Sequence, residues 1–159
     1  MSDGAVSGIL NYLRIDASLA TSGQPSVDEL GAVASNGTEV VINLALHDDP
    51  RYSLADEAGT VTGLGMTYVH IPVKFDAPTE RDLFAFFDAM ERHRGRKLYV
   101  HCAANKRVSA FLGLYRVIRE GWDADRAFAP MHEIWEPNAA WAPFIAAMLE
   151  KHGQGKPPG

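Results

Sequence analysis

The stretch HCAANKRVS, residues 101–109, holds the residue types of this chain that most clearly suggest chemistry. It contains Cys102, the only cysteine among 159 residues, at the end of a short apolar run and just before a helical pattern. A thiol at such a junction meets unpaired backbone N–H groups and the positive end of the helix macrodipole, and both lower its pKa. We therefore expect Cys102 to be a thiolate nucleophile at neutral pH.

The same N–H groups predict a nest for an anion beside the sulfur. Lys106 and Arg107 add positive charge there, and the Ser109 hydroxyl is placed to stabilise the thiolate as a leaving group. The competing interpretation is that Cys102 is a small buried hydrophobe at a strand end. The basic and hydroxyl-bearing neighbours favour the nucleophile over that interpretation.

Strand-like and helix-like segments alternate along the chain and must position this loop. Ser26 and Glu29 predict a capping box at the start of one helix, and Thr79 predicts the cap of another. Residues 10–16 and 19–25 are interpreted as a turn of helix or strand followed by a loop. The other expected elements are strands over 38–46, 66–73 and 97–102 and helices over 27–35, 53–62, 79–94, 106–121, 123–135 and 139–151.

This order of elements predicts an α/β fold with a mainly parallel central sheet flanked by helices. Ligands of such sheets bind beyond the carboxyl ends of the strands, where we expect Cys102. We expect a single domain over residues 1–152, since a chain of this length is about one domain. The polar, glycine- and proline-rich end of the chain, residues 153–159, is predicted to be a disordered tail.

The composition, 47% hydrophobic and 22% charged, is that of an ordinary globular protein. A formal net charge of −5 argues against nucleic acid as a partner. The chain has no run of the roughly 18–20 apolar residues that a membrane span needs, and its start lacks the cations of a secretory signal. A single cysteine, which cannot form an internal disulfide, fits a reducing compartment. We therefore expect a cytoplasmic protein with no membrane partner.

The loop motif carries a resemblance to a known family. HCAANKRVS resembles the signature of the cysteine-dependent protein tyrosine and dual-specificity phosphatases, in which His-Cys, five further residues, Arg, and Ser or Thr follow one another. SGQPSVDEL, VVINLAL and VHIPVKFDAPT are similar, in the same order, to segments of the small bacterial dual-specificity-like phosphatases, so the resemblance covers roughly residues 19–120. It implies a dual-specificity-phosphatase-like fold.

The resemblance also implies roles for individual residues. Cys102 matches the nucleophile, Ser109 matches the hydroxyl that assists its departure, and Asp76 in KFDAPTE matches the general acid. Arg107 is the candidate for the arginine that holds the phosphoryl group. The implied substrate-binding residues are those of the loop: Ala103, Ala104, Asn105, Lys106 and Val108.

The arginine departs from the family pattern. Only four residues separate Cys102 from Arg107, and Val108 stands where the phosphatase arginine is expected. Either Arg107 emerges about 100° around the helix from the usual direction, or the loop is one residue shorter, as in rhodanese sulfurtransferases. Asn105 stands where phosphatase loops usually carry Gly, at a position expected to need positive φ, which Asn tolerates better than most residues.

The implied mechanism begins when the Cys102 thiolate attacks phosphorus in line, while the loop amides and Arg107 hold the equatorial oxygens. Asp76 protonates the leaving oxygen and then activates the water that hydrolyses the phosphocysteine. Neither a metal nor an organic cofactor is required. The expected partners are a phosphorylated protein or small molecule and, in the loop, phosphate or sulfate.

Two groups of polar residues receive structural interpretations. His101 points away from the nucleophile along an extended strand, so a hydrogen-bonded structural role is favoured over a catalytic base. His47, Asp48 and Asp49 match no strong metal-ligand spacing and are interpreted as a solvated loop.

A further set of residues is interpreted mainly as packing. Trp135, Asn138 and Trp141 are expected in the core or at a helix junction, with a wall of the substrate cleft as the alternative. Gln24 is a weaker cleft candidate.

The leading hypothesis is hydrolysis of a phosphate monoester, with phosphotyrosine as one candidate substrate. A noncatalytic phosphate- or phosphoprotein-binding module is the first alternative, motivated by Val108. Rhodanese-like sulfur transfer is the second, motivated by the four-residue gap between Cys102 and Arg107.

Overall fold

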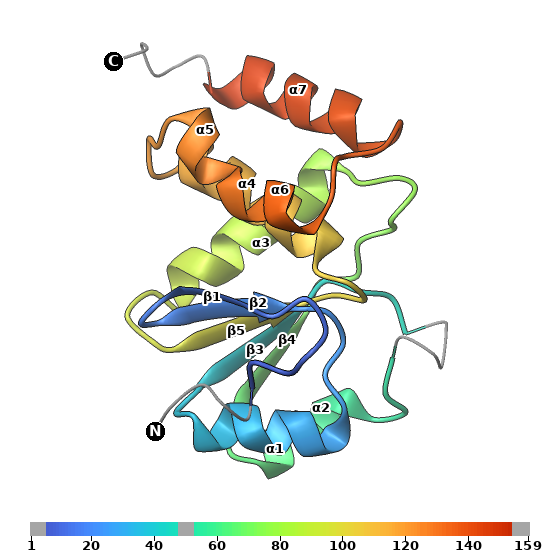
Figure 1. Cartoon of the computed structure of the whole chain (residues 1–159), viewed down its shortest axis with the longest axis vertical. Helices are drawn as coiled ribbons and strands as arrows, with labels where there is room; N and C mark the ends of the chain where they lie inside the picture. The colour runs from blue at the N-terminus through green and yellow to red at the C-terminus, as the bar shows by residue number, and fades with distance from the viewer. Residues whose placement is uncertain (1–5, 48–52, 154–159) are drawn as a thin grey trace.

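The computed structural model describes residues 6–47 and 53–153, which form a sheet between two layers of helices (Figure 1). The sheet has five strands in the order β1-β2-β5-β3-β4. β2, β5, β3 and β4 run parallel, and β1 pairs with β2 in the antiparallel sense at one edge. The predicted mainly parallel α/β fold is confirmed. The strands are β1 Leu13–Asp16, β2 Leu19–Ser22, β3 Val40–Asn43, β4 Thr67–His70 and β5 Leu98–His101.

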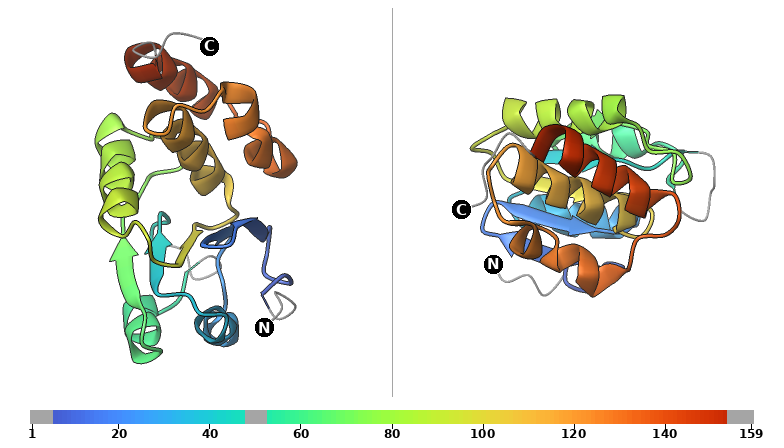
Figure 2. Two further views of the ribbon diagram at one scale, coloured as in Figure 1. Left: turned by 90° about the vertical axis from the view of Figure 1, so that its left-hand side faces the viewer. Right: turned by 90° about the horizontal axis from the view of Figure 1, so that it is seen from above.

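The helices divide unequally between the two faces of the sheet (Figures 1 and 2). α1 Val27–Ser35 and α2 Glu57–Gly63 cover one face. The other face is covered by a thicker layer in which α7 packs on α4 from outside. The helices of this layer are α3 Glu80–Arg92, α4 Lys106–Ile118, α5 Ala124–Ala127, α6 Ala129–Ile134 and α7 Trp141–His152.

The central strand β5 sends alternate side chains to opposite faces, as an extended backbone requires. Leu98, Val100 and Cys102 belong to the core beneath the thicker helical layer. Tyr99 belongs to the core beneath α1 and α2. His101 shares this second side, because its imidazole reaches α2. The nucleophile candidate and the histidine before it therefore face different helical layers.

Local signals located several helix ends correctly, although the strands β3 and β4 are shorter than expected. The Ser26 hydroxyl accepts from the Glu29 N–H and the Glu29 carboxylate accepts from the Ser26 N–H, so the predicted capping box is confirmed. Thr79 caps α3 as predicted. Gly95 and Gly121 follow the ends of α3 and α4 with φ of 88° and 74°.

Two predictions about the elements were wrong. Residues 19–22 form β2, a strand buried between β1 and β5, where a loop was expected. The helix expected over 123–135 is two short helices that meet at Phe128, because Pro130 favours the first turn of a new helix. The expected disordered tail, residues 153–159, lies outside the described residues except for Gly153.

We predict that Gly113→Ala destabilises the fold although alanine favours helices. Gly113 lies in α4, and a Cβ built there would overlap the Phe128 ring. Overpacking of this kind costs about 1–3 kcal/mol, against a helix-propensity gain of about 1 kcal/mol. Urea denaturation should show a lower midpoint. The control is Gly31→Ala in α1, whose added Cβ meets nothing within 4 Å and should raise the midpoint. Equal effects of the two substitutions would contradict this packing.

Candidate active site

Cys102 follows β5 directly and lies at the carboxyl end of the parallel strands. A cavity of about 350 Å³ opens at this point. The Cys102 side chain is fully buried yet contributes to the cavity wall, so it forms part of the floor. The residues that line the cavity are Phe75, Cys102, Ala103, Ala104, Lys106 and Arg107.

The loop between β5 and α4 is tied to the segment that follows β2. The Gln24 N–H donates to the Ala103 carbonyl at 3.0 Å, and Gly23 forms an isolated bridge with Ala104. The Asn11 side-chain amide donates to the Ala104 carbonyl at 2.9 Å. These bonds use loop carbonyls as acceptors, while the first N–H groups of α4 have no partner inside the helix. The loop is thus held from the side opposite to the one where an anion would bind.

Asn105 is the residue that turns the loop into the helix. Its φ of 67° lies in the left-handed region, as predicted from the sequence. Its side chain is buried and donates to the Asn11 carbonyl at 2.8 Å and to the Thr21 hydroxyl at 3.0 Å. Asn105 therefore fixes the turn and does not line the cavity.

Arg107 reaches the cavity in spite of its position one residue early. Its Nη1 donates to the Val73 carbonyl at 2.8 Å, and its Cζ lies 5.6 Å from the centroid of the Phe75 ring. Its Nε is buried and has no acceptor, and no carboxylate of the described residues forms an ion pair with the guanidinium. Val108, which was expected in the substrate site, is instead fully buried in the core. The burial of Val108 and the position of Arg107 at the cavity favour the interpretation in which the loop is one residue shorter. They disfavour the interpretation in which Arg107 emerges in another direction around the helix.

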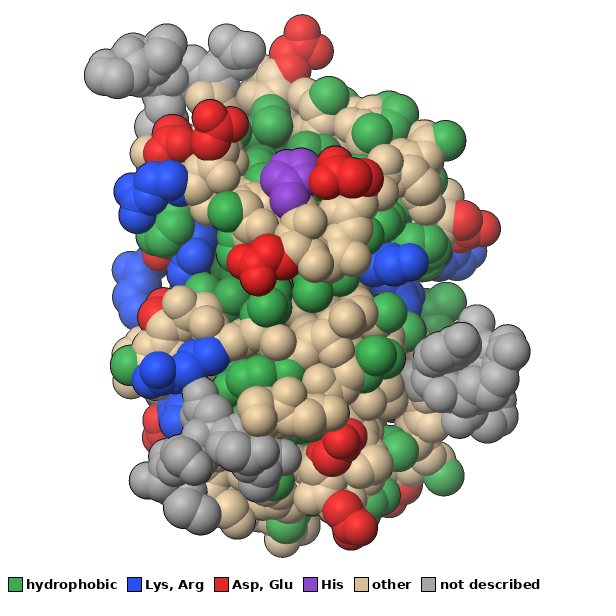
Figure 3. Space-filling view, viewed as in Figure 1, with side chains coloured by type: hydrophobic (Ala, Val, Ile, Leu, Met, Phe, Trp, Pro, Cys, Tyr) green, Lys and Arg blue, Asp and Glu red, His purple; other side chains and the backbone are tan. Residues whose placement is uncertain are grey.

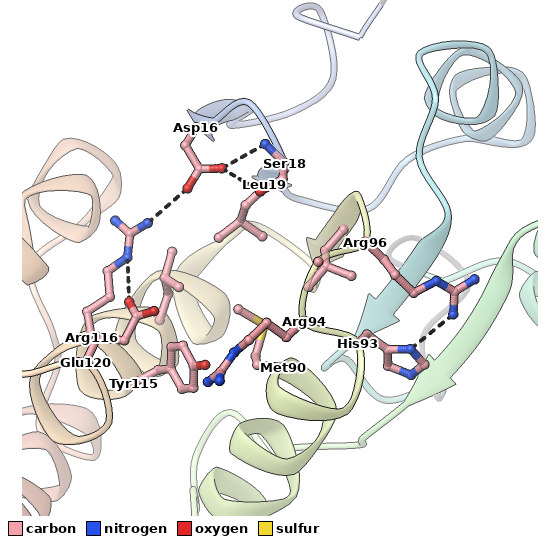
Figure 4. Close-up of a pocket in the computed structure, with 13 residues that line it drawn as sticks. Asp16, Ser18, Leu19, Met90, His93, Arg94, Arg96, Tyr115, Arg116 and Glu120 are labelled. Carbon is pink, nitrogen blue, oxygen red and sulfur yellow. Dashed lines mark hydrogen bonds and ion pairs between the residues drawn. The ribbon is translucent and has the colours of Figure 1, made fainter.

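A second cavity contains an arginine, Arg116, that is paired with carboxylates. It measures about 140 Å³ and lies near Leu98, at the opposite end of β5 from Cys102 (Figure 4). Its Arg116 lies 3.6 Å from the Asp16 carboxylate and 3.8 Å from the Glu120 carboxylate. The positive charge of Arg116 is thus balanced within the protein, in contrast to that of Arg107.

An aromatic group supports the loop that bears Phe75 over the cavity. The Trp141 indole N–H donates to the Phe75 carbonyl at 2.6 Å, and Trp141 is fully buried. Trp135 packs against Phe75 with ring centroids 5.6 Å apart, and the Lys106 ammonium lies 5.7 Å from the Trp135 ring. Asn138 Oδ1 accepts from the N–H groups of Ala140 and Trp141, in the turn that leads into α7. The packing interpretation of Trp141 is confirmed, whereas Asn138 is exposed at the start of α7.

Two predicted catalytic residues lie near the cavity without lining it. Asp76 is exposed and follows Phe75 in a turn closed by the Ala77 N–H to Lys74 carbonyl bond. The Ser109 hydroxyl donates to the Lys106 carbonyl at 3.1 Å and not to the sulfur.

A buried ion pair behind the loop was missed by the sequence analysis. His101 Nε2 lies 2.5 Å from the Glu57 carboxylate, and both side chains are fully buried. Gln24, considered above as a cleft candidate, instead donates from Nε2 to the same carboxylate at 2.8 Å. The structural role predicted for His101 is confirmed. Sequence analysis did not single out Glu57, because an acidic residue in the first turn of a helix is ordinarily explained by its favourable interaction with the helix dipole.

The histidine in the other polar cluster is held by neutral partners. His47 Nε2 contacts the Asn43 amide at 3.1 Å and the Tyr68 hydroxyl at 3.2 Å, and its ring stacks on His70. Asp48 and Asp49 lie outside the described residues. Within the described ranges, no three His, Cys, Asp or Glu residues are grouped as a metal site would need.

The fold and the loop place this protein among the dual-specificity and tyrosine phosphatase-like proteins. The family described as "DSP-PTPase phosphatase fused to NAD+ Kinase" matches residues 11–139, and the chain belongs to that family.

Individual relatives agree with this assignment. A DUF442 protein from Shewanella putrefaciens CN-32, described as a candidate phosphatase, is 31% identical, with a TM-score of 0.84 over 96% of this chain and 99% of that one. The beta-lactamase hydrolase-like protein of Xylella fastidiosa is 34% identical over 69% of this chain, which spans only 26% of that relative. The Pseudomonas aeruginosa protein TpbA, solved with pTyr, shares the fold at a TM-score of 0.69 over 94% of this chain and 92% of that one, with 16% identity.

We predict that the Asn105 position is selected for its left-handed backbone. Asn105→Ala and Asn105→Gly both remove the bonds to Asn11 and Thr21, but only alanine adds strain at φ 67°. Alanine should therefore be less stable than glycine by about 1–2 kcal/mol, as judged by urea denaturation. Equal stability of the two variants would mean that the side-chain bonds alone decide the preference.

Proposed function

We propose that this protein is a cysteine-dependent phosphatase that hydrolyses phosphate monoesters through a phosphocysteine at Cys102. The observation that carries the proposal is the shared cavity of Cys102 and Arg107, in which the buried guanidinium has no carboxylate partner from the described part of the chain. A buried charge is costly unless it is paired, so such a site favours an incoming anion. The family of the chain supports the same reaction class.

In the proposed reaction, the Cys102 thiolate attacks phosphorus and the bond to the leaving oxygen breaks. The helix N–H groups and Arg107 hold the equatorial oxygens, where negative charge is concentrated. Asp76 gives its proton to the leaving oxygen. It then takes a proton from the water that attacks the phosphocysteine, and this step releases phosphate and restores the thiolate with help from Ser109. The proton that Asp76 gives to the leaving oxygen is thus replaced by one from the hydrolytic water, and Asp76 ends the cycle protonated.

The substrate class proposed here is a phosphorylated protein or small molecule. The aromatic wall at Phe75, against which Trp135 packs, suits an aryl phosphate such as phosphotyrosine, and TpbA offers a precedent for phosphotyrosine on this fold. Within the described part of the chain, no helix is long and apolar enough to cross a membrane. A single domain over residues 1–152 and a cytoplasmic location complete the proposal.

The test is hydrolysis of an aryl phosphate by the full chain. Cys102→Ser should abolish turnover, and Arg107→Lys should lower kcat/KM by about 10²–10³-fold, because a point charge replaces a planar group with several donors. Val108→Arg combined with Arg107→Ala should not restore activity, since position 108 lies in the core. Wild-type protein without turnover that still binds inorganic phosphate would point to the noncatalytic alternative.

Asp76→Asn is predicted to separate substrates by their leaving groups. With an alkyl or unactivated phenyl phosphate, kcat should fall by about 10²–10⁴-fold because the leaving oxygen needs a proton. With a strongly activated aryl phosphate the loss should be much smaller. Steady-state kinetics on the two substrates provide the measurement. Asp88→Asn, at an exposed site of α3, is the matched control and should change neither rate. Equal losses on both substrates would remove Asp76 from the acid role.

Sulfur transfer is a second candidate function because one observation favours it. The loop has four residues between Cys102 and Arg107, and the small side chains of Ala103 and Ala104 line the cavity beside the sulfur. A tight cradle of this kind suits a persulfide. Cyanide-dependent formation of thiocyanate from thiosulfate tests the candidate, and its absence would remove it.

A further inference from the structure

The carboxylate of Glu57 is part of a buried chain of polar groups behind the nucleophile. Gln24 Nε2 donates to Glu57 Oε1 at 2.8 Å, and His101 Nε2 lies 2.5 Å from Glu57 Oε2. Glu57 is fully buried although it occupies the first turn of α2. These contacts connect three segments of the protein: the one after β2, the start of α2 and the end of β5.

Each ring nitrogen of His101 faces an oxygen atom. Its Nε2 faces a carboxylate oxygen, and its Nδ1 faces the Cys102 carbonyl oxygen at 3.4 Å. Both partners are acceptors. A neutral imidazole has one N–H and therefore serves only one of them, whereas an imidazolium serves both. With Glu57 ionised, an imidazolium satisfies both contacts, and its positive charge balances the carboxylate of Glu57.

The surroundings agree with an ionised Glu57. Burial by itself raises the pKa of Glu57, but the hydrogen bonds from His101 and Gln24 and the charge of His101 outweigh burial, so the net shift is downward. The other titratable groups that act on Glu57 or respond to it are His47 and Tyr68. Burial and the nearby His70 lower the pKa of His47, and burial raises that of Tyr68, so both are neutral at pH 7.

We propose that Glu57 is a positioning residue for the nucleophile: it keeps His101 doubly protonated, with one N–H on the Cys102 carbonyl and a positive charge directly behind the thiolate. The role rests on the proposed function of Cys102 as a nucleophile. Glu57 touches neither the cavity nor the sulfur. It acts through His101, and Gln24 orients it from the far side. Because Gln24 also holds the Ala103 carbonyl through its backbone N–H, the same residue links the ion pair to the loop.

The test uses the single cysteine as its own reporter. The rate at which iodoacetamide alkylates Cys102 as a function of pH gives the titration midpoint of the thiol and requires no phosphatase activity. Glu57→Gln should raise this midpoint by about one pH unit, since an opposite charge nearby typically lowers a pKa by about 1–3 units. Glu57→Asp keeps the charge and should return the midpoint most of the way to the wild-type value.

The matched control is Glu136→Gln, which breaks an exposed Glu–His pair, His132 with Glu136 at 2.7 Å, far from the cysteine in sequence. It should leave the midpoint unchanged. In the wild-type protein, nitrogen NMR of the His101 ring should show both nitrogens protonated at pH 7, and this readout does not depend on a variant that folds.

A neutral His101 ring at pH 7 would overturn the proposal, as would an unchanged alkylation midpoint in folded Glu57→Gln protein. Failure of the phosphatase assay alone is a different result: it would remove the reaction proposed for Cys102 while the alkylation and NMR results still report on the ion pair.

Discussion

The site depends on a buried guanidinium, that of Arg107, which has no carboxylate partner among the residues that the structure describes. Taking a cation out of water is expensive, and a carbonyl bond and an aromatic ring offset only part of that cost. For Arg107 these partial partners are the Val73 carbonyl and the Phe75 ring. Within residues 6–47 and 53–153, therefore, no carboxylate neutralises Arg107, and an oxyanion bound over Cys102 would accept hydrogen bonds from its guanidinium. Arg116, neutralised by Asp16 and Glu120, has no such need.

The rest of the fold serves to hold that charge and the sulfur at fixed positions. Four parallel strands bring β5 to the middle of the sheet, and α4 starts directly beyond it. Asn11 and Gln24, on the segments just before β1 and just after β2, supply the bonds that shape the loop from one side. Trp141 fixes the carbonyl of Phe75 from the other side. Rigid elements thus surround a short loop, which is how a site keeps its groups aligned before substrate binds.

The sequence predicted what depends on neighbours along the chain. The capping box at Ser26, the positive φ at Asn105 and the position of Cys102 between strand and helix all follow from local rules. β2 escaped prediction because four residues with no clear alternation carry little signal, and its burial comes from pairing with a strand almost eighty residues later, as in Thr21 with Val100. The partnership of Glu57 with His101 spans 44 residues and leaves no local pattern. The structure was also needed to establish where Arg107 points. A shift of one residue decides whether a side chain lines the cavity, as Arg107 does, or lies in the core, as Val108 does.

The measurement that tests the central claim most directly is a single-turnover reaction with an aryl phosphate, quenched in acid and analysed by mass spectrometry of the peptide that contains Cys102. The account predicts a peptide heavier by one phosphoryl group, formed in wild-type protein and accumulating when Asp76 is replaced by Asn with an activated substrate. An unmodified Cys102 peptide throughout the turnover of a substrate that is nevertheless hydrolysed would contradict the account.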